Sequence, residues 1–140
     1  VLAVMRRIAL LPGSETGLVV CDASGTLVFR KPAPGFPLPR YGAACPLWPL
    51  YAALGRAMVP IRARVETAGP SGARVQALAF CLSRLPGGFS GPELREAAML
   101  ILPDSGPRQP DVLAVGSTCR ICPRADCAAR REPSITREGV

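Results

Sequence analysis

The chain has 140 residues, 49% of them hydrophobic, with six cysteines, no histidine and a formal net charge of +7. This size and apolar content suffice for one domain with a buried core, while every apolar run is shorter than the ~18 residues that a membrane span needs. We therefore expect one soluble domain without a membrane partner. Because clustered thiols and the lack of a signal-peptide cleavage pattern suit a reducing compartment, we expect a cytoplasmic location.

Arginine supplies 16 of the 17 basic residues. Guanidinium groups suit phosphate and carboxylate partners, although a GC-rich genome produces the same bias. The charges are scattered without an interleaved aromatic stripe, and the Pro- and Gly-rich loops leave no room for a helix-turn-helix, which argues against a DNA-binding surface. No activated-serine motif, phosphate-binding Gly-rich loop or spaced carboxylate pair is present, so we do not expect an enzyme.

The first elements that the sequence predicts form a β-hairpin. After a lead-in segment at residues 1–16, two short apolar or β-branched runs at 17–21 and 26–30 flank the Asp and Gly of a tight turn at 22–25. Four prolines within residues 31–39 then predict an extended loop, because proline cannot donate a backbone hydrogen bond.

The middle of the chain predicts a helix and a second hairpin. Pro46 at a first helical position, followed by leucines at helical spacing, predicts a short helix that ends before Gly55. Residues 61–67 alternate apolar and charged side chains, which indicates a strand with one solvated face. Residues 74–84 are largely apolar and are predicted to be its central antiparallel partner.

The last third of the chain leaves one choice open. Residues 92–96 look like a helix start, and the apolar run at 97–102 fits either the rest of that helix or a buried strand, because periodicity alone does not separate the two. A short apolar piece at 111–115 leads to Gly116, where a cysteine-rich loop opens. One helical turn is expected at residues 128–132.

Together these elements predict an α+β fold. We expect an antiparallel sheet of four or five strands with one or two helices covering one face, in the manner of PAS or GAF sensor domains, and a Cys-rich C-terminal loop. The domain is expected to span residues 17–133, followed by a disordered tail at 134–140. Many unrelated functions share such folds, so the function has to be argued from a site.

Three cysteines close to the C-terminus have the spacing of metal ligands. Two residues separate Cys119 from Cys122, and four separate Cys122 from Cys127. A CxxC pair lets two thiolates converge on one centre, and a third thiolate one turn later closes one face of a tetrahedral ion or an iron–sulfur cube. A disulfide with a spare thiol, or three incidental cysteines, is the alternative interpretation.

A fourth ligand has to come from elsewhere in the chain or from outside it. Because histidine is absent, the candidates are Cys21, Cys45, Cys81, a carboxylate or a non-protein ligand. Cys45 is the best of these, since it lies in a loop-like stretch at an apparent helix start. Cys21 and Cys81 lie within apolar runs and are interpreted as small buried hydrophobic residues.

Two cysteine-containing segments resemble a known family. One is residues 41–48, Tyr-Gly-Ala-Ala-Cys-Pro-Leu-Trp, and the other is residues 115–127, Val-Gly-Ser-Thr-Cys-Arg-Ile-Cys-Pro-Arg-Ala-Asp-Cys. They resemble the C-terminal sensory domain of the short-chain fatty acyl-CoA regulators, which are bacterial transcription factors of propionate, methylcitrate and glyoxylate metabolism. The likeness runs from about Gly17 to Pro133.

The resemblance implies a domain that senses short-chain acyl-CoA and carries an iron–sulfur cluster, of the 4Fe–4S type, on Cys45, Cys119, Cys122 and Cys127. It also implies that DNA is bound only through a helix-turn-helix domain, joined by a middle metallopeptidase-like segment, that these residues do not include. The alternative is a structural zinc module in which the same thiolates hold a closed site for protein interaction. A homodimer is left open.

Five further residues near the cysteine motifs are candidates for ligand binding: Arg40, Tyr41, Trp48, Arg120 and Arg124. Arg40 either reaches a CoA phosphate or caps its loop, and Trp48 fits core packing better than a ligand platform. Arg120 and Arg124 flank the thiols, so they either stabilise thiolate charge or bind the ligand.

Overall fold

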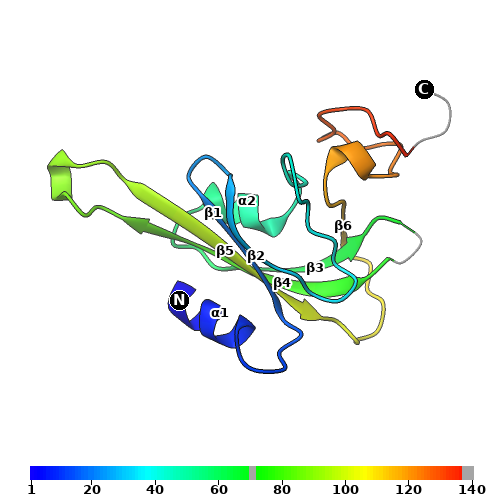
Figure 1. Ribbon diagram of the computed structural model, residues 1–140, viewed down its shortest axis with the longest axis horizontal. Coiled ribbons are helices and arrows are strands. Elements are labelled where there is room, and N and C mark those ends of the chain that lie inside the picture. Colours follow the sequence, from blue (N-terminus) through cyan, green and yellow to red (C-terminus); the bar gives the residue numbers. More distant parts are fainter. Residues whose placement is uncertain (70–71, 137–140) are drawn as a thin grey trace.

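The computed structural model describes residues 1–69 and 72–136. Within them a mixed sheet has six strands in the order β2-β1-β5-β4-β3-β6 (Figure 1). The strands are β1 (Gly17–Asp22), β2 (Leu27–Lys31), β3 (Ile61–Thr67), β4 (Arg74–Arg84), β5 (Leu94–Pro103) and β6 (Leu113–Val115). The other elements are the α-helices α1 (Leu2–Ala9) and α2 (Pro49–Leu54) and the 3₁₀ turns η1 (Gly88–Ser90) and η2 (Cys119–Ile121).

Both predicted hairpins are present. β1 pairs antiparallel with β2, with Leu18 opposite Lys31, and the Lys31 ammonium also donates to the backbone oxygens of Ser14 and Thr16. β3 and β4 have the predicted bounds and pair antiparallel, with Val65 opposite Val75. The local patterns of these four strands were therefore sufficient to place them.

The prediction of four or five antiparallel strands was wrong in two respects, although the α+β class is confirmed. The described residues form six strands, and β6 pairs parallel with β3, placing Glu66 opposite Ala114. A strand of three residues carries no readable periodicity, and its direction depends on the path of the loop before it. This parallel pair brings the cysteine-rich loop to the end of the sheet (Figure 1).

The predicted helix start at residues 92–96 was also wrong, because residues 94–103 form strand β5. β5 pairs antiparallel with β1 on one side and with β4 on the other. Its residues 97–101 are all buried, and a strand buried on both faces loses the alternation that would identify it. Hydrogen bonding to the two neighbouring strands β1 and β4 fixes the extended conformation of β5.

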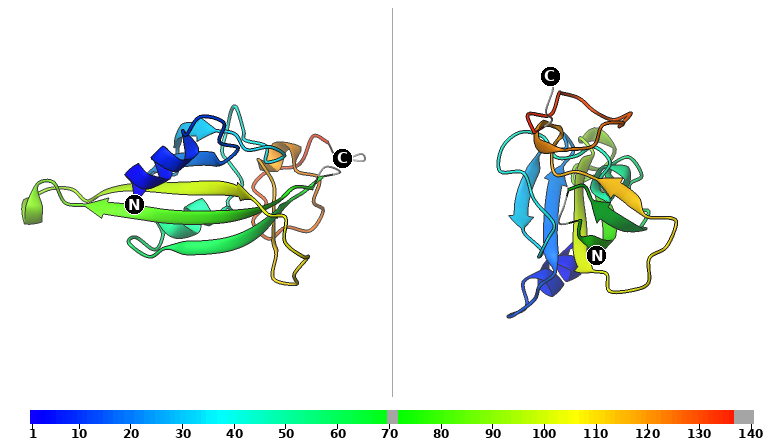
Figure 2. Two further views of the ribbon diagram at one scale, coloured as in Figure 1. Left: turned by 90° about the horizontal axis from the view of Figure 1, so that it is seen from below. Right: turned by 90° about the vertical axis from the view of Figure 1, so that its right-hand side faces the viewer.

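The two helices lie on opposite faces of the sheet (Figure 2). The expectation that only one face is covered was therefore wrong, because α1, within the lead-in segment, packs on the second face. α2 begins at Pro49 rather than at Pro46, with Trp48 as its extended N-cap residue. A proline still occupies the first helical position, where its missing N–H costs nothing.

Strand β1 shows how one segment contributes to two cores. Leu18 and Val20 belong to the cluster with α1, while Val19 and Cys21 belong to the larger cluster that includes α2. All four side chains are fully buried, and each contributes roughly 1 to 3 kcal/mol of hydrophobic stabilisation. The sheet is therefore held between two apolar layers.

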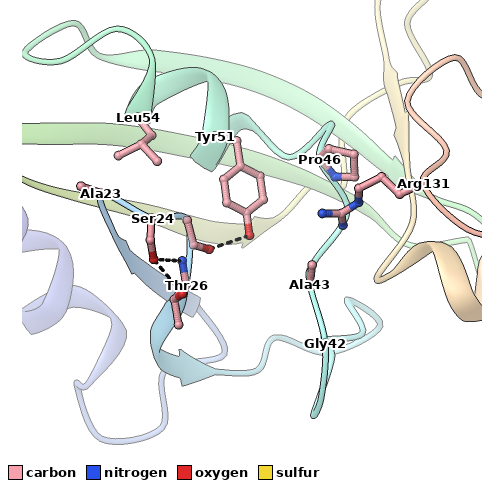
Figure 3. A pocket seen from close by; sticks show the side chains of 10 residues that line it. Ala23, Ser24, Thr26, Gly42, Ala43, Pro46, Tyr51, Leu54 and Arg131 are labelled. Carbon is pink, nitrogen blue, oxygen red and sulfur yellow. Dashed lines mark hydrogen bonds between the residues drawn. The ribbon is translucent and has the colours of Figure 1, made fainter.

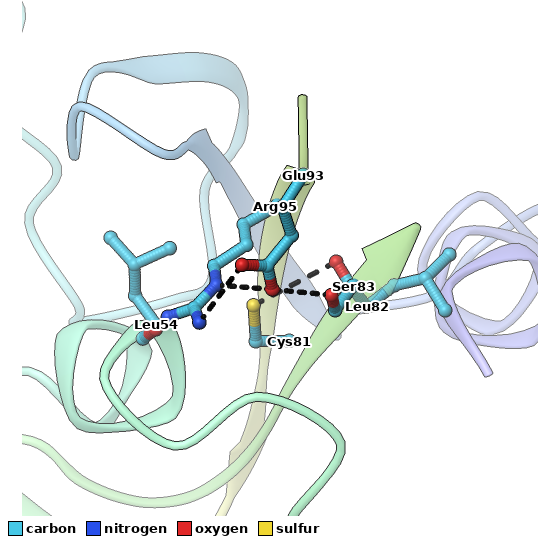
Figure 4. A network of polar contacts seen from close by, with 6 residues as sticks. All are labelled: Leu54, Cys81, Leu82, Ser83, Glu93 and Arg95. Atoms are coloured by element: carbon cyan, nitrogen blue, oxygen red, sulfur yellow. Dashed lines mark hydrogen bonds and ion pairs between the residues drawn. The ribbon is translucent and has the colours of Figure 1, made fainter. Parts of the chain in front are cut away.

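A polar network fastens α2 to the sheet (Figure 4). The Arg95 Nε donates to Glu93 Oε1 at 2.8 Å, and its Nη1 donates to the Leu54 carbonyl oxygen at 3.3 Å. The Ser83 hydroxyl donates to the same Glu93 oxygen. Arg95 thus satisfies a carbonyl at the C-terminal end of α2 from a neighbouring strand.

The C-terminal residues contact the cysteine loop as far as the structure describes them. Ser134 is buried, and the Ile135 N–H donates to the Arg120 carbonyl oxygen at 2.8 Å. The tail was expected to be disordered from residue 134, and its residues 137–140 lie outside the described part. Residues 128–129 form a turn where a helical turn was expected. No helix among the described residues is long and apolar enough to cross a bilayer.

Burial in β1 predicts an unreactive thiol at Cys21. Burial raises the pKa of this thiol to about 12, so at pH 8 it stays protonated and lacks the nucleophilic thiolate. We expect iodoacetamide to leave Cys21 unmodified in the folded protein and to modify it fully in guanidinium chloride, as measured by peptide mass spectrometry. Equal alkylation rates with and without denaturant would contradict this placement.

Candidate functional site

The site lies where the loop before α2 meets the chain leaving β6. The Cys45 N–H donates to the Ser117 carbonyl oxygen at 2.8 Å, and the Ala68 N–H, just after β3, donates to the Val115 carbonyl oxygen at 2.8 Å. The first bond joins two segments about seventy positions apart, and the second holds the chain leaving β6 against the end of β3 (Figure 1).

Gly116 is the point of closest approach between these segments. Its N–H donates to Cys45 Sγ at 3.4 Å, and its carbonyl oxygen accepts from Trp48 Nε1 at 2.8 Å. A Cβ on Gly116 would lie 2.9 Å from Cys122 Sγ, which is closer than real Cβ contacts allow. The sequence motif contained this glycine, but its role becomes visible only when the Cys45 loop and the CxxC turn are both in place.

The four predicted ligands line one cavity. The 3₁₀ turn η2 begins at Cys119, and its C-cap residue is Cys122, whose N–H donates to the Cys119 carbonyl oxygen at 3.3 Å. Both line a cavity of about 10 Å³ together with Cys45 and Cys127. That volume is about one water-sized sphere, too small for an organic ligand. Cys45 therefore lies beside the cysteine triplet, and its role as fourth ligand stays a prediction.

The thiols form no disulfide and are mostly buried. All six cysteines are free, and of the four at the cavity only Cys127 is half-buried rather than buried. Burial raises the pKa of the Cys45 thiol, the N–H groups of Gly116 and Leu47 lower it, and the nearby Cys119 and Cys122 raise it further. In residues 1–69 and 72–136 no group of three or more metal-ligating side chains stands close enough to hold an ion, so the ligand roles stay a prediction.

Cys21 and Cys81 lie away from this cavity, as their apolar neighbours indicated. They occupy β1 and β4, the two strands that pair with β5, and both are fully buried within the larger hydrophobic cluster. The cavity lining instead includes two arginines, Arg124 and Arg130. Sequence reasoning missed Arg130, because an arginine at the end of a loop carries no pattern that marks it as part of a cavity lining.

A second, larger pocket adjoins the cavity (Figure 3). It encloses about 500 Å³, within the range of small-molecule sites. Its lining consists of Ala23, Ser24, Gly25, Thr26, Gly42, Ala43, Pro46, Tyr51, Leu54 and Arg131. The β1–β2 turn, the loop before Cys45, α2 and the C-terminal segment therefore all contribute, and Pro46 lines both the pocket and the cysteine cavity.

Arg131 and Tyr51 have the longest polar side chains in the pocket lining. The Arg131 Nη2 donates to the Ala44 carbonyl oxygen, directly before Cys45. The Tyr51 hydroxyl donates to the Gly25 carbonyl oxygen at 3.4 Å. Burial raises the pKa of Tyr51 to about 12, so at neutral pH its phenol is a hydrogen-bond donor.

The five residues predicted to bind a ligand do not converge. All five belong to the described residues, and none lines the 500 Å³ pocket. Tyr41 is 88% exposed, and Arg40 and Arg120 are also exposed. Trp48 is fully buried, which fits the core-packing interpretation, and Arg124 donates to the Ala114 carbonyl oxygen at 2.9 Å beside the cysteine cavity.

The domain is thus an α+β sheet that ends in a thiol-lined cavity beside a larger pocket. The family model of the short-chain fatty acyl coenzyme A regulator, C-terminal, matches residues 16–139, and the chain belongs to this family. The resemblance carried by the two cysteine motifs is thereby confirmed.

Two relatives extend this result. The propionyl-CoA carboxylase regulator of Cereibacter sphaeroides is 31% identical over 124 residues, which cover 81% of this chain and 26% of the relative. The solved structure of a Mycobacterium tuberculosis transcriptional regulator matches with a TM-score of 0.80 at 24% identity, over 98% of this chain and 46% of that one. That structure has the same fold. The chain thus spans about a quarter of the first relative and under half of the second.

The close approach at Gly116 predicts the effect of adding one methyl group there. In Gly116→Ala the new Cβ would meet Cys122 Sγ at 2.9 Å, so the CxxC turn has to move. We expect a loss of about 1 to 3 kcal/mol in the free energy of unfolding, typical of overpacking. Urea unfolding followed by Trp48 fluorescence measures it.

Gly55→Ala is the matched control. A Cβ there meets nothing closer than 3.7 Å, and the backbone φ of −76° suits any residue. We expect the control to change the free energy of unfolding by less than about 0.5 kcal/mol. An equal effect of the two substitutions would show that the contact with Cys122 does not constrain position 116.

Proposed function

We propose that this domain is the acyl-CoA-sensing, metal-binding part of a transcriptional regulator. The family supports the regulatory role, and the name of the Cereibacter relative points to propionyl-CoA metabolism. The proposal rests on one observation: the loop before α2 lines both the larger pocket and the thiol cavity. Gly42 and Ala43 line the larger pocket, Cys45 lines the thiol cavity, and Pro46 lines both.

The larger pocket has the chemistry that a short-chain acyl-CoA requires. The exposed guanidinium of Arg131 can pair with a phosphate, and the hydroxyls of Ser24 and Thr26 can accept or donate hydrogen bonds beside it. Leu54 and Pro46 offer apolar surface for a short acyl chain. This pocket replaces the scattered set of five residues as the proposed ligand site.

The thiol cavity suits a soft metal centre. Its ligating side chains are four cysteines, and thiolates select iron–sulfur clusters and zinc over hard cations. We propose that Cys45, Cys119, Cys122 and Cys127 hold an iron–sulfur cluster, as the family resemblance implies. Such a cluster supplies a redox-sensitive centre that links the Cys45 loop to the C-terminal loop.

A structural zinc site is the second candidate, and the volume of the cavity favours it. The cavity of about 10 Å³ is closer in size to a single ion than to a four-iron cluster. The thiols among the described residues would have to move closer together to hold either. Both candidates use the same ligands. They differ in the metal and in whether oxidation changes the site.

Ligand and metal are proposed to be coupled through the Cys45 loop. A phosphate bound by Arg131 would compete with the Ala44 carbonyl oxygen for that guanidinium. Releasing the carbonyl alters the loop immediately before Cys45 and hence the geometry of one metal ligand. The signal then passes to DNA-binding domains outside these 140 residues, so this chain acts as a regulator and not as an enzyme.

Metal analysis tests the ligand set. We expect protein purified without oxygen to be brown, with iron and sulfide in near-equal amounts. Cys45→Ser replaces a soft thiolate by a hydroxyl that binds iron and zinc poorly, so its metal should become labile. Cys21→Ala and Cys81→Ala are the controls, and they should keep full metal while losing about 1 kcal/mol of stability.

Two outcomes would change this assignment. A colourless protein with one tightly bound zinc would replace the cluster by the zinc module and keep the four ligands. Full metal in Cys45→Ser, with loss of metal in the Cys21 or Cys81 variant, would show that Cys45 does not join the two loops.

Binding calorimetry tests the pocket. Arg131→Gln removes the charged partner of a phosphate, and because a hydrogen bond to a charged group contributes about 1.5 to 3 kcal/mol, affinity for propionyl-CoA should fall roughly tenfold or more. Arg108→Gln is the control, since Arg108 is exposed, pairs with Glu66 and lies outside the pocket lining. Equal dissociation constants in the two variants would place the ligand elsewhere.

A further inference from the structure

Arg130 fastens the cysteine loop through its guanidinium group. Nη1 donates to the carbonyl oxygens of Cys119 and Glu132, at 3.0 and 3.1 Å. Nη2 donates to the carbonyl oxygens of Cys122 and Arg124, the first at 3.1 Å. One side chain therefore binds the backbone of two predicted metal ligands and of two further positions in the loop.

The third nitrogen of the same group has no partner. Arg130 Nε is the one buried side-chain nitrogen or oxygen that lacks a hydrogen-bond partner in residues 1–69 and 72–136. A buried unpaired donor costs about 1 to 3 kcal/mol, so native proteins rarely leave one without a reason. Arg130 also lines the cavity formed by Cys45, Cys119, Cys122 and Cys127. The unused N–H thus belongs to a side chain that borders four sulfur atoms.

We propose that Arg130 is a positioning and tuning residue of the metal centre, whose Nε–H donates to a metal-bound cysteine sulfur. This inference rests on the proposed metal site. A thiolate accepts hydrogen bonds and carries the negative charge that a guanidinium offsets. The fork to the four carbonyls fixes the guanidinium at the border of the cavity that the four sulfurs line.

Charge and geometry predict the direction of the effect. Four thiolates concentrate negative charge in a mostly buried site, and reduction of a cluster adds one more negative charge. A donor and positive charge beside the sulfurs stabilise the reduced form more than the oxidised form, which raises the reduction potential. Outer-shell partners of metal ligands also typically change metal affinity by about tenfold to a hundredfold.

The test compares Arg130→Lys, Arg130→Gln and the control Arg108→Gln, each as metal-loaded protein. Lysine keeps the charge but has neither the fork nor an Nε–H at that place, so we expect both Arg130 variants to release metal to a chelator about tenfold faster or more. The midpoint potential should fall by roughly 59 mV, a tenfold shift of a one-electron equilibrium. The control should match the wild type, because Arg108 pairs with Glu66 at an exposed site.

A zinc-loaded protein is tested by the same chelator assay and, after cobalt substitution, by the sulfur-to-metal charge-transfer band. We expect this band to shift in both Arg130 variants. Wild-type protein loaded with a spin-active cadmium isotope gives a test without substitution, since a hydrogen bond to a ligating sulfur should produce scalar coupling between the metal and the Arg130 Nε proton. That measurement applies even if a variant fails to fold.

Each result bears on the inference separately from the proposed function. Wild-type protein that binds no metal would refute the metal site itself. Metal-loaded wild type without coupling to the Nε proton, together with variants that keep wild-type release rates, spectra and potentials, would refute the role of Arg130 alone. A lysine variant that behaves like wild type would also refute it, because charge without the Nε donor would then be sufficient.

Discussion

The site depends on the absence of a side chain at Gly116. With only a hydrogen on its Cα, the chain leaving β6 can lie against Cys122 and still give its N–H to Cys45 and its carbonyl to Trp48. A Cβ would lie 2.9 Å from the Cys122 sulfur and would push the CxxC turn away. The cavity, the Cys45 loop and the buried end of α2 therefore share one packing constraint.

Two consecutive arginines line the thiol cavity and the larger pocket. Arg130 holds the cysteine loop by its backbone and borders the thiol cavity, whereas Arg131 lines the larger pocket and donates to the carbonyl before Cys45. The two arginines are adjacent in the chain and line different cavities. The short turn between Cys127 and Arg130 sets this arrangement. A displacement of one arginine can therefore be transmitted along the backbone to the next and so from one cavity to the other.

The sheet gives the site a rigid base. β6 extends the sheet beyond β3 as its parallel edge strand, and the cysteine loop follows directly from it. Helices on both faces bury the central strands, so the sheet end is fixed while the loops that carry the cysteines remain at the surface (Figure 2). The family and the 0.80 TM-score place this chain among regulators with the same fold.

The sequence by itself predicted most of the local elements and singled out the four cysteines that line one cavity. Alternation in residues 61–67 predicted a strand because a strand buried on one face alternates apolar and polar residues. The Asp and Gly at 22–25 predicted the tight turn between two strands. Cys45 was separable from Cys21 and Cys81 by its surroundings, and the cysteine spacing led to the family. Tertiary structure alone decided that β5 is a strand, since burial on both faces erases periodicity. It also decided the parallel pairing of β6, the pocket around Arg131 and the burial of the Arg130 Nε atom, because these depend on contacts between separate segments of the chain.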